Sequence, residues 1–208
     1  MPSFSSSIHH ESEPAWDVAR LFPPQGLWSE ADYMDLTERT NRLVEFTDGC
    51  IEVLEMPTQA HQFLVRFLVD AMRAFVEPRH LGEVLFAPLR VRISANKFRE
   101  PDVVFMRNHH ADRRKEDFWE GADLVMEVIS KDPESRRRDM EAKRSDYAEA
   151  RIPEYWIVDP AELQVTVLAL VGETYVVDGL FGVDEQATSL LLPGFTVKVA
   201  KLFKAADV

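Results

Sequence analysis

Cysteine is nearly absent from this chain, which has a single one, Cys50, in 208 residues. A lone cysteine excludes an internal disulfide and offers no thiolate cluster for zinc, so its usage fits a reducing cytoplasm. Long apolar runs are lacking too: the longest uncharged one, from Val165 to Gly172, is far shorter than the roughly 20 residues that span a membrane. No secretory signal pattern and no internal repeat appear. The sequence therefore predicts a cytoplasmic protein without a membrane segment.

Basic residues are outnumbered, with 24 Lys and Arg against 36 Asp and Glu and a formal net charge of −12. This balance excludes a protein whose whole surface binds nucleic acid. The charge is uneven, however, and positive side chains gather in one segment, which holds Arg136, Arg137, Arg138, Lys143 and Arg144. A polyanion would bind at this local patch. The alternative is a solvated helix face whose cations pair with Glu and Asp on neighbouring turns.

The length and the hydrophobic content of 46% are enough for one well-filled domain. Residues 1–26 are rich in serine and proline without a hydrophobic period, so we expect a disordered leader there. Residues 27–208 are expected to form a single domain. Its predicted helices and strands alternate along the chain as follows: a capped helix from Ser29 to Thr37, a hairpin around Asp48-Gly49, a helix over 57–77, strands within 82–93, 102–105 and 123–130, a helix over 134–151, a strand over 154–160, and an antiparallel meander over 163–180.

Two carboxylates interrupt segments that otherwise look like buried strands. Glu127 lies in the apolar run Asp123–Ser130, and Asp102 begins the β-prone run Val103-Val104-Phe105. Burying an ionised carboxylate costs several kcal/mol unless it is paired or bound to a cation. Oxygen ligands on adjacent strands suit Mg²⁺, which takes one or two carboxylates together with waters. The sequence therefore predicts a hard-cation site between these strands.

The helix that follows supplies a candidate for a positive partner. Arg136, Met140, Lys143 and Tyr147 recur at the spacing of one helix face, and we expect that face to look back at the sheet. His61, in the first turn of the helix over 57–77, has two interpretations. It is either a partly exposed residue bonded to a neighbouring loop, or an orienting or phosphate-contacting group at the metal end of the sheet.

The ordered set Pro101-Asp102-Val103, Asp123 to Ser130 with Glu127, Arg138-Asp139 with Lys143 and Tyr147, and Tyr155-Trp156-Ile157-Val158-Asp159-Pro160 resembles the PD-(D/E)XK nuclease superfamily. More closely, it is similar to a bacterial restriction-endonuclease-like family that is often found in many copies per genome. The resemblance covers roughly residues 29–200. It implies an α/β (α+β) fold with a restriction-endonuclease-like core, in which a mixed central sheet is flanked by helices and followed by the C-terminal antiparallel meander.

The resemblance also implies roles for single residues. Asp102 and Glu127 would bind Mg²⁺ or Mn²⁺, with the Val128 carbonyl as a third ligand. The superfamily lysine would stand two residues after Glu127, where this chain has Ile129. Lys143 is the natural substitute, because a long lysine stem can bring its ammonium to the same point from a neighbouring helix.

Glu45 is a further acidic group of this predicted site, aiding a ligand water or a second ion. On strand alternation alone, the solvent face of the hairpin is an equally good place for it. The arginines of the basic patch, Arg136, Arg137, Arg138 and Arg144, would hold DNA phosphates.

The first hypothesis for function is thus a metal-dependent DNA endonuclease in which Lys143 positions the attacking water. The alternative is a catalytically inactive nuclease fold that binds nucleic acid or protein, and a third hypothesis is a structural scaffold. A homodimer is expected for the enzyme, since cutting both strands of a duplex needs two sites.

Overall fold

The computed structural model describes residues 22–40, 42–129, 136 and 138–206, with Arg138 and Asp139 described by their backbone alone. The helices are α2 (Glu30–Arg39), α3 (Gln59–Val76), α5 (Lys143–Glu149) and α6 (Val199–Lys204), with short 3-10 helices at Glu77–Arg79 and Asn108–Arg113 and a π-helical turn at Arg138–Ala142. The strands are β1 (Val44–Thr47), β2 (Cys50–Val53), β3 (Gly82–Phe86), β4 (Val91–Ser94), β5 (Lys97–Arg99), β6 (Val103–Arg107), β7 (Trp119–Glu120), β8 (Leu124–Val128), β9 (Glu154–Asp159), β10 (Gln164–Val171), β11 (Thr174–Phe181), β12 (Gln186–Thr188) and β13 (Thr196–Lys198).

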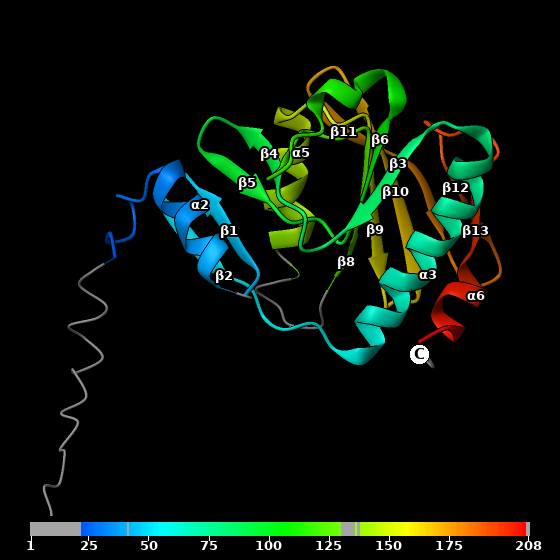
Figure 1. Ribbon diagram of the computed structural model, residues 1–208. Coiled ribbons are helices and arrows are strands. Elements are labelled where there is room, and N and C mark those ends of the chain that lie inside the picture. The colour runs from blue at the N-terminus through cyan, green and yellow to red at the C-terminus, as the bar shows by residue number, and fades with distance from the viewer. Residues whose placement is uncertain (1–21, 41, 130–135, 137, 207–208) are drawn as a thin grey trace, which may run out of the picture.

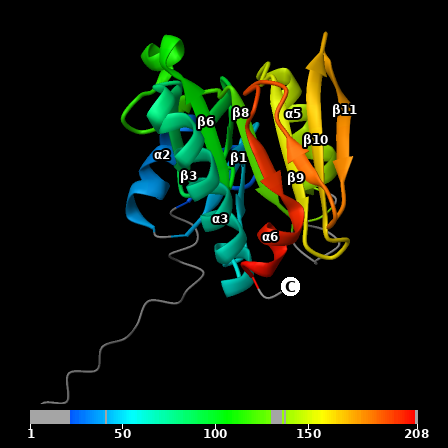
Figure 2. The same cartoon turned by 90° about the vertical axis from the view of Figure 1, so that its right-hand side faces the viewer.

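The centre of the molecule is a six-stranded sheet in the order β11-β10-β9-β8-β6-β3 (Figures 1 and 2). Strands β8 and β9 run parallel, and α5 lies between them in the sequence. The other neighbours in this sheet are antiparallel, so it is mixed. This confirms the predicted fold class: a mixed sheet flanked by helices, in which β10 and β11 form the predicted meander.

A second sheet of five strands, in the order β2-β1-β5-β4-β7, was not predicted. The sequence over 82–93 suggested a strand with a break or two short strands, and the structure has two. Strand β3 belongs to the six-stranded sheet and β4 to the five-stranded one, and Pro88 lies between them. Proline cannot donate to a sheet ladder, so the chain leaves one sheet at this residue and enters the other.

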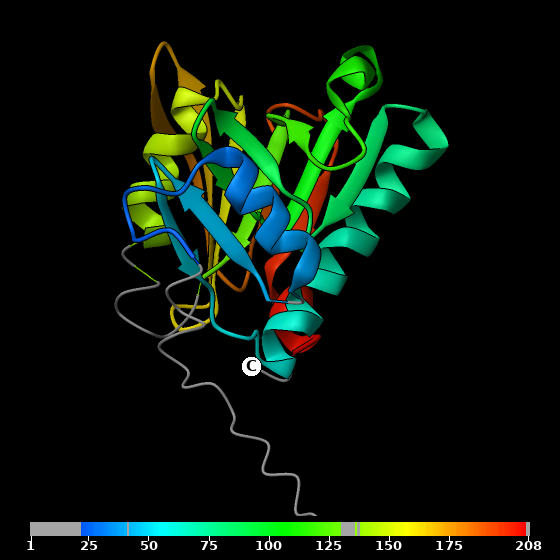
Figure 3. The same cartoon turned by 60° about the vertical axis from the view of Figure 1, so that its left-hand side comes forward.

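Three apolar clusters hold the layers together. One face of the six-stranded sheet packs against α3 and α6, through residues such as Leu68, Met72 and Leu202. The opposite face packs against α5 and β4 of the smaller sheet. The outer face of that smaller sheet is covered by α2 (Figure 3), whose Tyr33 stacks on Phe46. The space between the two sheets, beside α5, therefore receives side chains from both of them.

The predicted caps and turns are present. Ser29 and Asp32 form a reciprocal capping box at the start of α2, and the Thr58 side chain accepts a hydrogen bond from the His61 amide at the start of α3. The hairpin turn has positive φ at both central residues, 47° at Asp48 and 83° at Gly49, as a tight two-residue turn requires. These local signals thus determine where β1, β2 and both helices begin.

The helix after β8 departs from the prediction. Residues 130–135 and 137 lie outside the described residues, and the next described turn is π-helical, over Arg138–Ala142. A π-helical turn holds more residues than an α-helical one, so it shifts the side-chain faces. Met140, predicted to face the sheet, is 41% exposed, whereas Lys143 and Tyr147 are buried as predicted.

The predicted leader, 1–26, lies mostly outside the described residues, since these begin at residue 22. Its last residues pair with the hairpin. The Gln25 side chain bonds both the amide and the carbonyl of Ile51, and the Gly26 amide donates to the Gly49 carbonyl. This segment therefore covers part of the outer edge of β2. Among the described helices, none combines the length and apolar character needed to cross a membrane.

Candidate active site

Asp102 directly precedes β6, and Glu127 lies on β8, the antiparallel neighbour of β6. The β6–β8 register pairs Val103 with Met126, and one step further along the same register brings Asp102 opposite Glu127. Directly opposed residues in such a pair have their Cβ atoms about 4.5–5.5 Å apart. On β8, Met126 and Val128 belong to the apolar cluster that packs against α3. Glu127 lies between them and therefore points to the other face of the sheet, toward α5. Asp102 and Glu127, the two residues predicted to share a cation, thus occupy neighbouring backbone positions at one end of this strand pair.

Asp102 is held by two partners. Its Oδ1 lies 2.8 Å from Nε2 of His61, and its Oδ2 accepts a hydrogen bond of 2.8 Å from the backbone amide of Val128. The first contact brings the N-terminal turn of α3 to the site. His61 is partly exposed and bonds to Asp102 in the segment before β6, so both interpretations of this histidine stay predictions.

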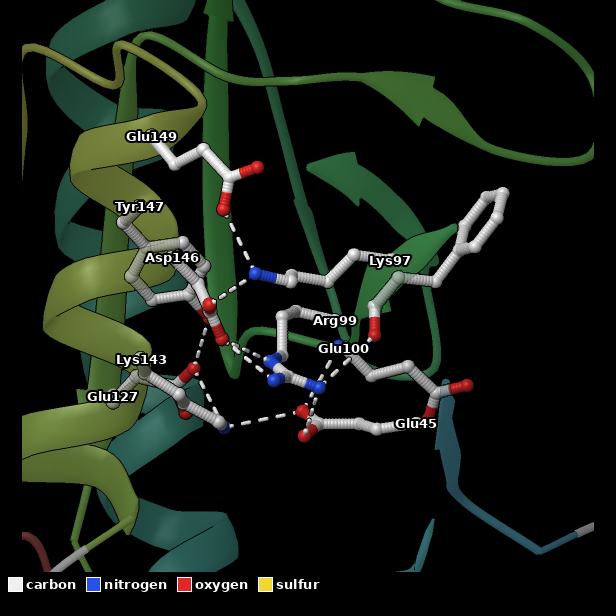
Figure 4. Close-up of polar contacts among 10 residues, drawn as sticks. Glu45, Lys97, Arg99, Glu100, Glu127, Lys143, Asp146, Tyr147 and Glu149 are labelled. Atoms are coloured by element: carbon white, nitrogen blue, oxygen red, sulfur yellow. Dashed lines mark hydrogen bonds and ion pairs between the residues drawn. The ribbon is translucent and has the colours of Figure 1, made fainter. Parts of the chain in front are cut away.

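Glu127 is only 3% exposed and is met by two side chains of α5 (Figure 4). Lys143 Nζ donates to Glu127 Oε1 at 2.8 Å, and the Tyr147 hydroxyl donates to the same oxygen at 2.5 Å. Lys143 itself is 3% exposed, so its ammonium points into the protein and not toward solvent. The buried carboxylate thus has the positive partner that its position in a covered strand requires.

Glu45 lies on the other side of Lys143. Its Oε1 is 3.3 Å from Lys143 Nζ, and its Oε2 is 3.4 Å from an Arg99 nitrogen. Glu45 is 1% exposed, so the suggestion that it occupies the solvent face of the hairpin is wrong. The reason is the layer order: Val44 and Phe46 face α2, and the intervening residue points into the space between the two sheets. Lys143 therefore bridges an acid from each sheet.

A further network of ion pairs, between β5 and α5, supports this arrangement. Arg99 donates to Asp146 Oδ2 through two nitrogens, at 2.9 and 2.6 Å, and Lys97 bonds both Asp146 and Glu149 at 2.8 Å (Figure 4). Burial works against the charge of Arg99, but Glu45 and Asp146 outweigh it and raise the pKa of its guanidinium. The network joins β5 to α5 and so fixes the helix that carries Lys143.

The position of the superfamily lysine is filled by Ile129, which is 2% exposed and packs in the apolar cluster under α5. The ammonium group that meets Glu127 is that of Lys143 on α5. Sequence reasoning placed Tyr147 on the correct helix face but gave it no role, and it missed Arg99 and Asp146 altogether. These two lie 47 residues apart, and no local pattern marks them as partners.

The donors that would hold a metal ion are the carboxylates of Asp102 and Glu127 and the carbonyl of Val128. Among the described residues, no three His, Cys, Asp or Glu side chains are grouped closely enough to hold an ion by themselves. Mg²⁺ and Mn²⁺ do not need such a group, since carboxylate, carbonyl and water oxygens suit both ions and Mg²⁺ usually takes one or two carboxylates plus waters. The donor set is therefore all oxygen and fits a hard divalent cation.

The predicted phosphate-binding arginines are engaged within the protein where the structure describes their side chains. Arg136 pairs with Asp159 at 2.6 Å, and Arg144 donates to the Tyr175 carbonyl at 2.6 Å. The side chains of Arg137 and Arg138 lie outside the described part. A DNA phosphate would compete with these internal partners for Arg136 and Arg144.

The carboxyl group of Glu100, buried beside Glu45, makes the stability of the protein depend on pH. Burial first, and then the charge of Glu45, raise the pKa of this carboxyl to about 7 from 4.5, against the opposing effects of the Val44 amide, Arg90 and Lys143. Between these values the folded protein binds a proton that the unfolded chain has released, so the free energy of unfolding falls as pH rises. We expect urea titrations to show a loss of about 2 kcal/mol between about pH 5 and about pH 8.

The Glu100→Gln variant should flatten that slope, because the neutral amide does not titrate. Exposed Glu83 is the matched control, and Glu83→Gln should keep the wild-type slope. A slope in Glu100→Gln equal to that of the wild type would contradict the assignment. Within the described residues, Glu100 Oε2 is buried without a hydrogen-bond partner, which agrees with the cost of ionising this group.

Comparisons with known proteins agree with the fold. The model of the Uma2 family, described as "Putative restriction endonuclease", matches residues 30–200. A crystal structure of a putative nuclease belonging to DUF820, from Anabaena variabilis, is similar with a TM-score of 0.66 and 17% identity, covering 83% of this chain and 98% of that chain. Among curated proteins, no match was found. The sheets and their flanking helices thus form a nuclease-like fold, and the predicted resemblance is confirmed.

Proposed function

The chain belongs to the Uma2 family, and on this premise we propose that it is an endonuclease that hydrolyses phosphodiester bonds of DNA with the help of Mg²⁺ or Mn²⁺. The observation that carries the proposal is the buried contact between Lys143 and Glu127, 2.8 Å long, beside Asp102. A protein that needed only the fold would gain little from a lysine here, since apolar residues pack at least as well in a buried site.

Asp102 and Glu127 would hold the cation, with the Val128 carbonyl as a further oxygen ligand. A divalent cation bound there supplies Lewis-acid chemistry, activating water and neutralising charge on the scissile phosphate. Lys143 would orient the attacking water through its ammonium and stabilise the negative charge that develops on the phosphate oxygens. In the reaction, the water oxygen bonds to phosphorus and the water gives up one proton, while the bond from phosphorus to one ester oxygen breaks and that oxygen takes up one proton as it leaves.

The remaining groups would support these three. His61 orients Asp102 through the contact at Oδ1, and Glu45 holds Lys143 from the side of the smaller sheet or assists a ligand water. Arg136, Arg137, Arg138 and Arg144 would contact DNA phosphates, which positions the duplex without reading its sequence. Two copies acting together would allow both strands of a duplex to be cut.

The test is the nicking of supercoiled plasmid by the purified full chain. We expect Mn²⁺ or Mg²⁺ to support conversion to open circles and EDTA to abolish it, with activity returning when the cation is added back in excess. A separate measurement of binding to labelled DNA in EDTA distinguishes the enzyme from the alternative, a catalytically inactive nuclease fold that binds DNA. A chain that binds DNA but cuts none with either cation is a nuclease fold used for binding, and the enzyme proposal is then wrong.

A further inference from the structure

Tyr147 is a buried residue to which the proposed reaction assigns no part. It has no exposed surface, and its hydroxyl donates to Glu127 Oε1, the oxygen that Lys143 also meets. The two donors lie one helical turn apart on α5, and both therefore approach the carboxylate from the same side (Figure 4). In this contact the hydroxyl is the donor, because an ionised carboxylate can only accept.

The ring of Tyr147 is held in place by its neighbours. It meets the ring of Tyr155 edge-on, with centroids 5.1 Å apart, and Tyr155 packs on Tyr175 at 6.0 Å. Tyr175 is anchored in turn, because its hydroxyl donates to the Ile152 carbonyl at 2.6 Å. The Tyr147 hydroxyl is thus a rigid donor whose place is set by the packing of α5 against β9 and β11.

Two donors from α5 meet the same oxygen of Glu127, Oε1. A carboxylate bonded by a single flexible lysine can rotate about its terminal bond, because that torsion has a broad energy profile. A second donor that cannot move restricts the rotation and directs the carboxylate plane. Hydrogen bonds to charged groups are about twice as strong as neutral ones, so this restriction persists while the site is loaded.

We propose that Tyr147 is a positioning residue that sets the rotation of the Glu127 carboxylate for binding of a divalent cation. The inference rests on the proposed function, since it requires Glu127 to be a metal ligand. Tyr147 touches neither substrate nor cation in this arrangement and acts only through Glu127. Partners that hold a ligand side chain in this way are worth about 10- to 100-fold in metal affinity.

The test compares two buried tyrosine hydroxyls. Tyr147→Phe removes the donor to Glu127, and Tyr175→Phe removes a donor to a backbone carbonyl in the same aromatic cluster. Mn²⁺ binding is measured on each DNA-free protein from the electron paramagnetic resonance signal of free Mn²⁺, with stability from urea unfolding. We expect Tyr147→Phe to weaken Mn²⁺ binding about 10-fold and Tyr175→Phe to leave it unchanged, whereas both lose stability.

Activity gives a second readout. Plasmid nicking by Tyr147→Phe should need more Mn²⁺ for half-maximal rate but recover most of the wild-type rate at saturation. Fluorotyrosine incorporated at position 147 keeps the hydroxyl and should therefore keep wild-type Mn²⁺ affinity. This variant still allows the test if Tyr147→Phe folds poorly. The inference is wrong if Tyr147→Phe binds Mn²⁺ with wild-type affinity, or if Tyr175→Phe loses as much Mn²⁺ affinity as Tyr147→Phe. In either case, Mn²⁺ binding by the wild type would still support the proposed function. A wild type that neither binds Mn²⁺ nor cuts DNA overturns both.

Discussion

Replacing Lys143 by methionine is expected to abolish plasmid nicking and to destabilise the protein by about 3 kcal/mol, because it removes the ammonium between two buried acids and leaves their charges poorly compensated. The side chain keeps most of its length and apolar volume, so the effect isolates the charge. In the structure Lys143 Nζ lies 2.8 Å from Glu127 and 3.3 Å from Glu45, and all three residues are at most 3% exposed. Urea unfolding gives the stability, and nicking with Mn²⁺ gives the activity.

Lys97 is the matched control for Lys143. It also bridges two acids, Asp146 and Glu149, but Asp146 keeps two hydrogen bonds from Arg99 and the Glu149 side chain is 50% exposed. Lys97→Met should therefore cost about 1 kcal/mol or less and leave nicking close to the wild-type rate. Lys143→Arg keeps the charge but presents a planar fork in place of a point charge, so it should not restore the rate. A folded Lys143→Met protein that nicks plasmid as fast as the wild type would remove Lys143 from the site.

Replacing Asp102 by asparagine is the second change with a large expected effect. Nicking should fall by at least about 100-fold, since loss of a ligand should exceed the loss caused by its outer partners. Mn²⁺ binding to the DNA-free protein should be weakened in parallel. The amide oxygen can still accept the hydrogen bond from the Val128 backbone, so we expect the variant to fold with a change in stability of about 1 kcal/mol.

Asp123 provides an unusually close control for Asp102. It too pairs with a histidine, His110 at 3.0 Å, and accepts a backbone amide hydrogen bond, from Arg107 at 2.8 Å. It differs in its place, because it precedes β8 and lies away from Lys143. Asp123→Asn should therefore leave Mn²⁺ binding and nicking unchanged. Equal losses in both variants would show that a partly buried histidine–aspartate pair matters for the fold and not for the chemistry.

Much of the site could be predicted because its residues lie in patterned segments. Glu127 interrupts an apolar strand, Asp102 begins another, and Lys143 and Tyr147 share a helix face, so each departs from or continues a local period. Glu45 could not be placed in this way. Alternation put it opposite Val44 and Phe46, but whether that side faces solvent or a second layer depends on a sheet that local patterns do not reveal.

The partners that support the site could not be predicted from the sequence for a similar reason. Arg99 and Asp146 are ordinary charged residues in their own segments, and only the packing of β5 against α5 makes them a pair. Met140 shows the opposite failure. Its spacing matched the buried face, but the π-helical turn before α5 altered the period, and the side chain is exposed.

The amino-acid sequence by itself determined the order of α2, α3 and the strands of the six-stranded sheet, the hairpin, the caps, and two acids within or just before strands that had to be covered, because each depends on neighbours within a few residues. The tertiary structure alone decided that two sheets enclose the space beside α5. That enclosure brings Glu45 from one sheet and Glu127 from the other to a single lysine. The physical reason is desolvation. The local sequence shows that a carboxylate lies in a segment that will be buried and must be paired, but which cation pairs with it depends on how distant strands pack together.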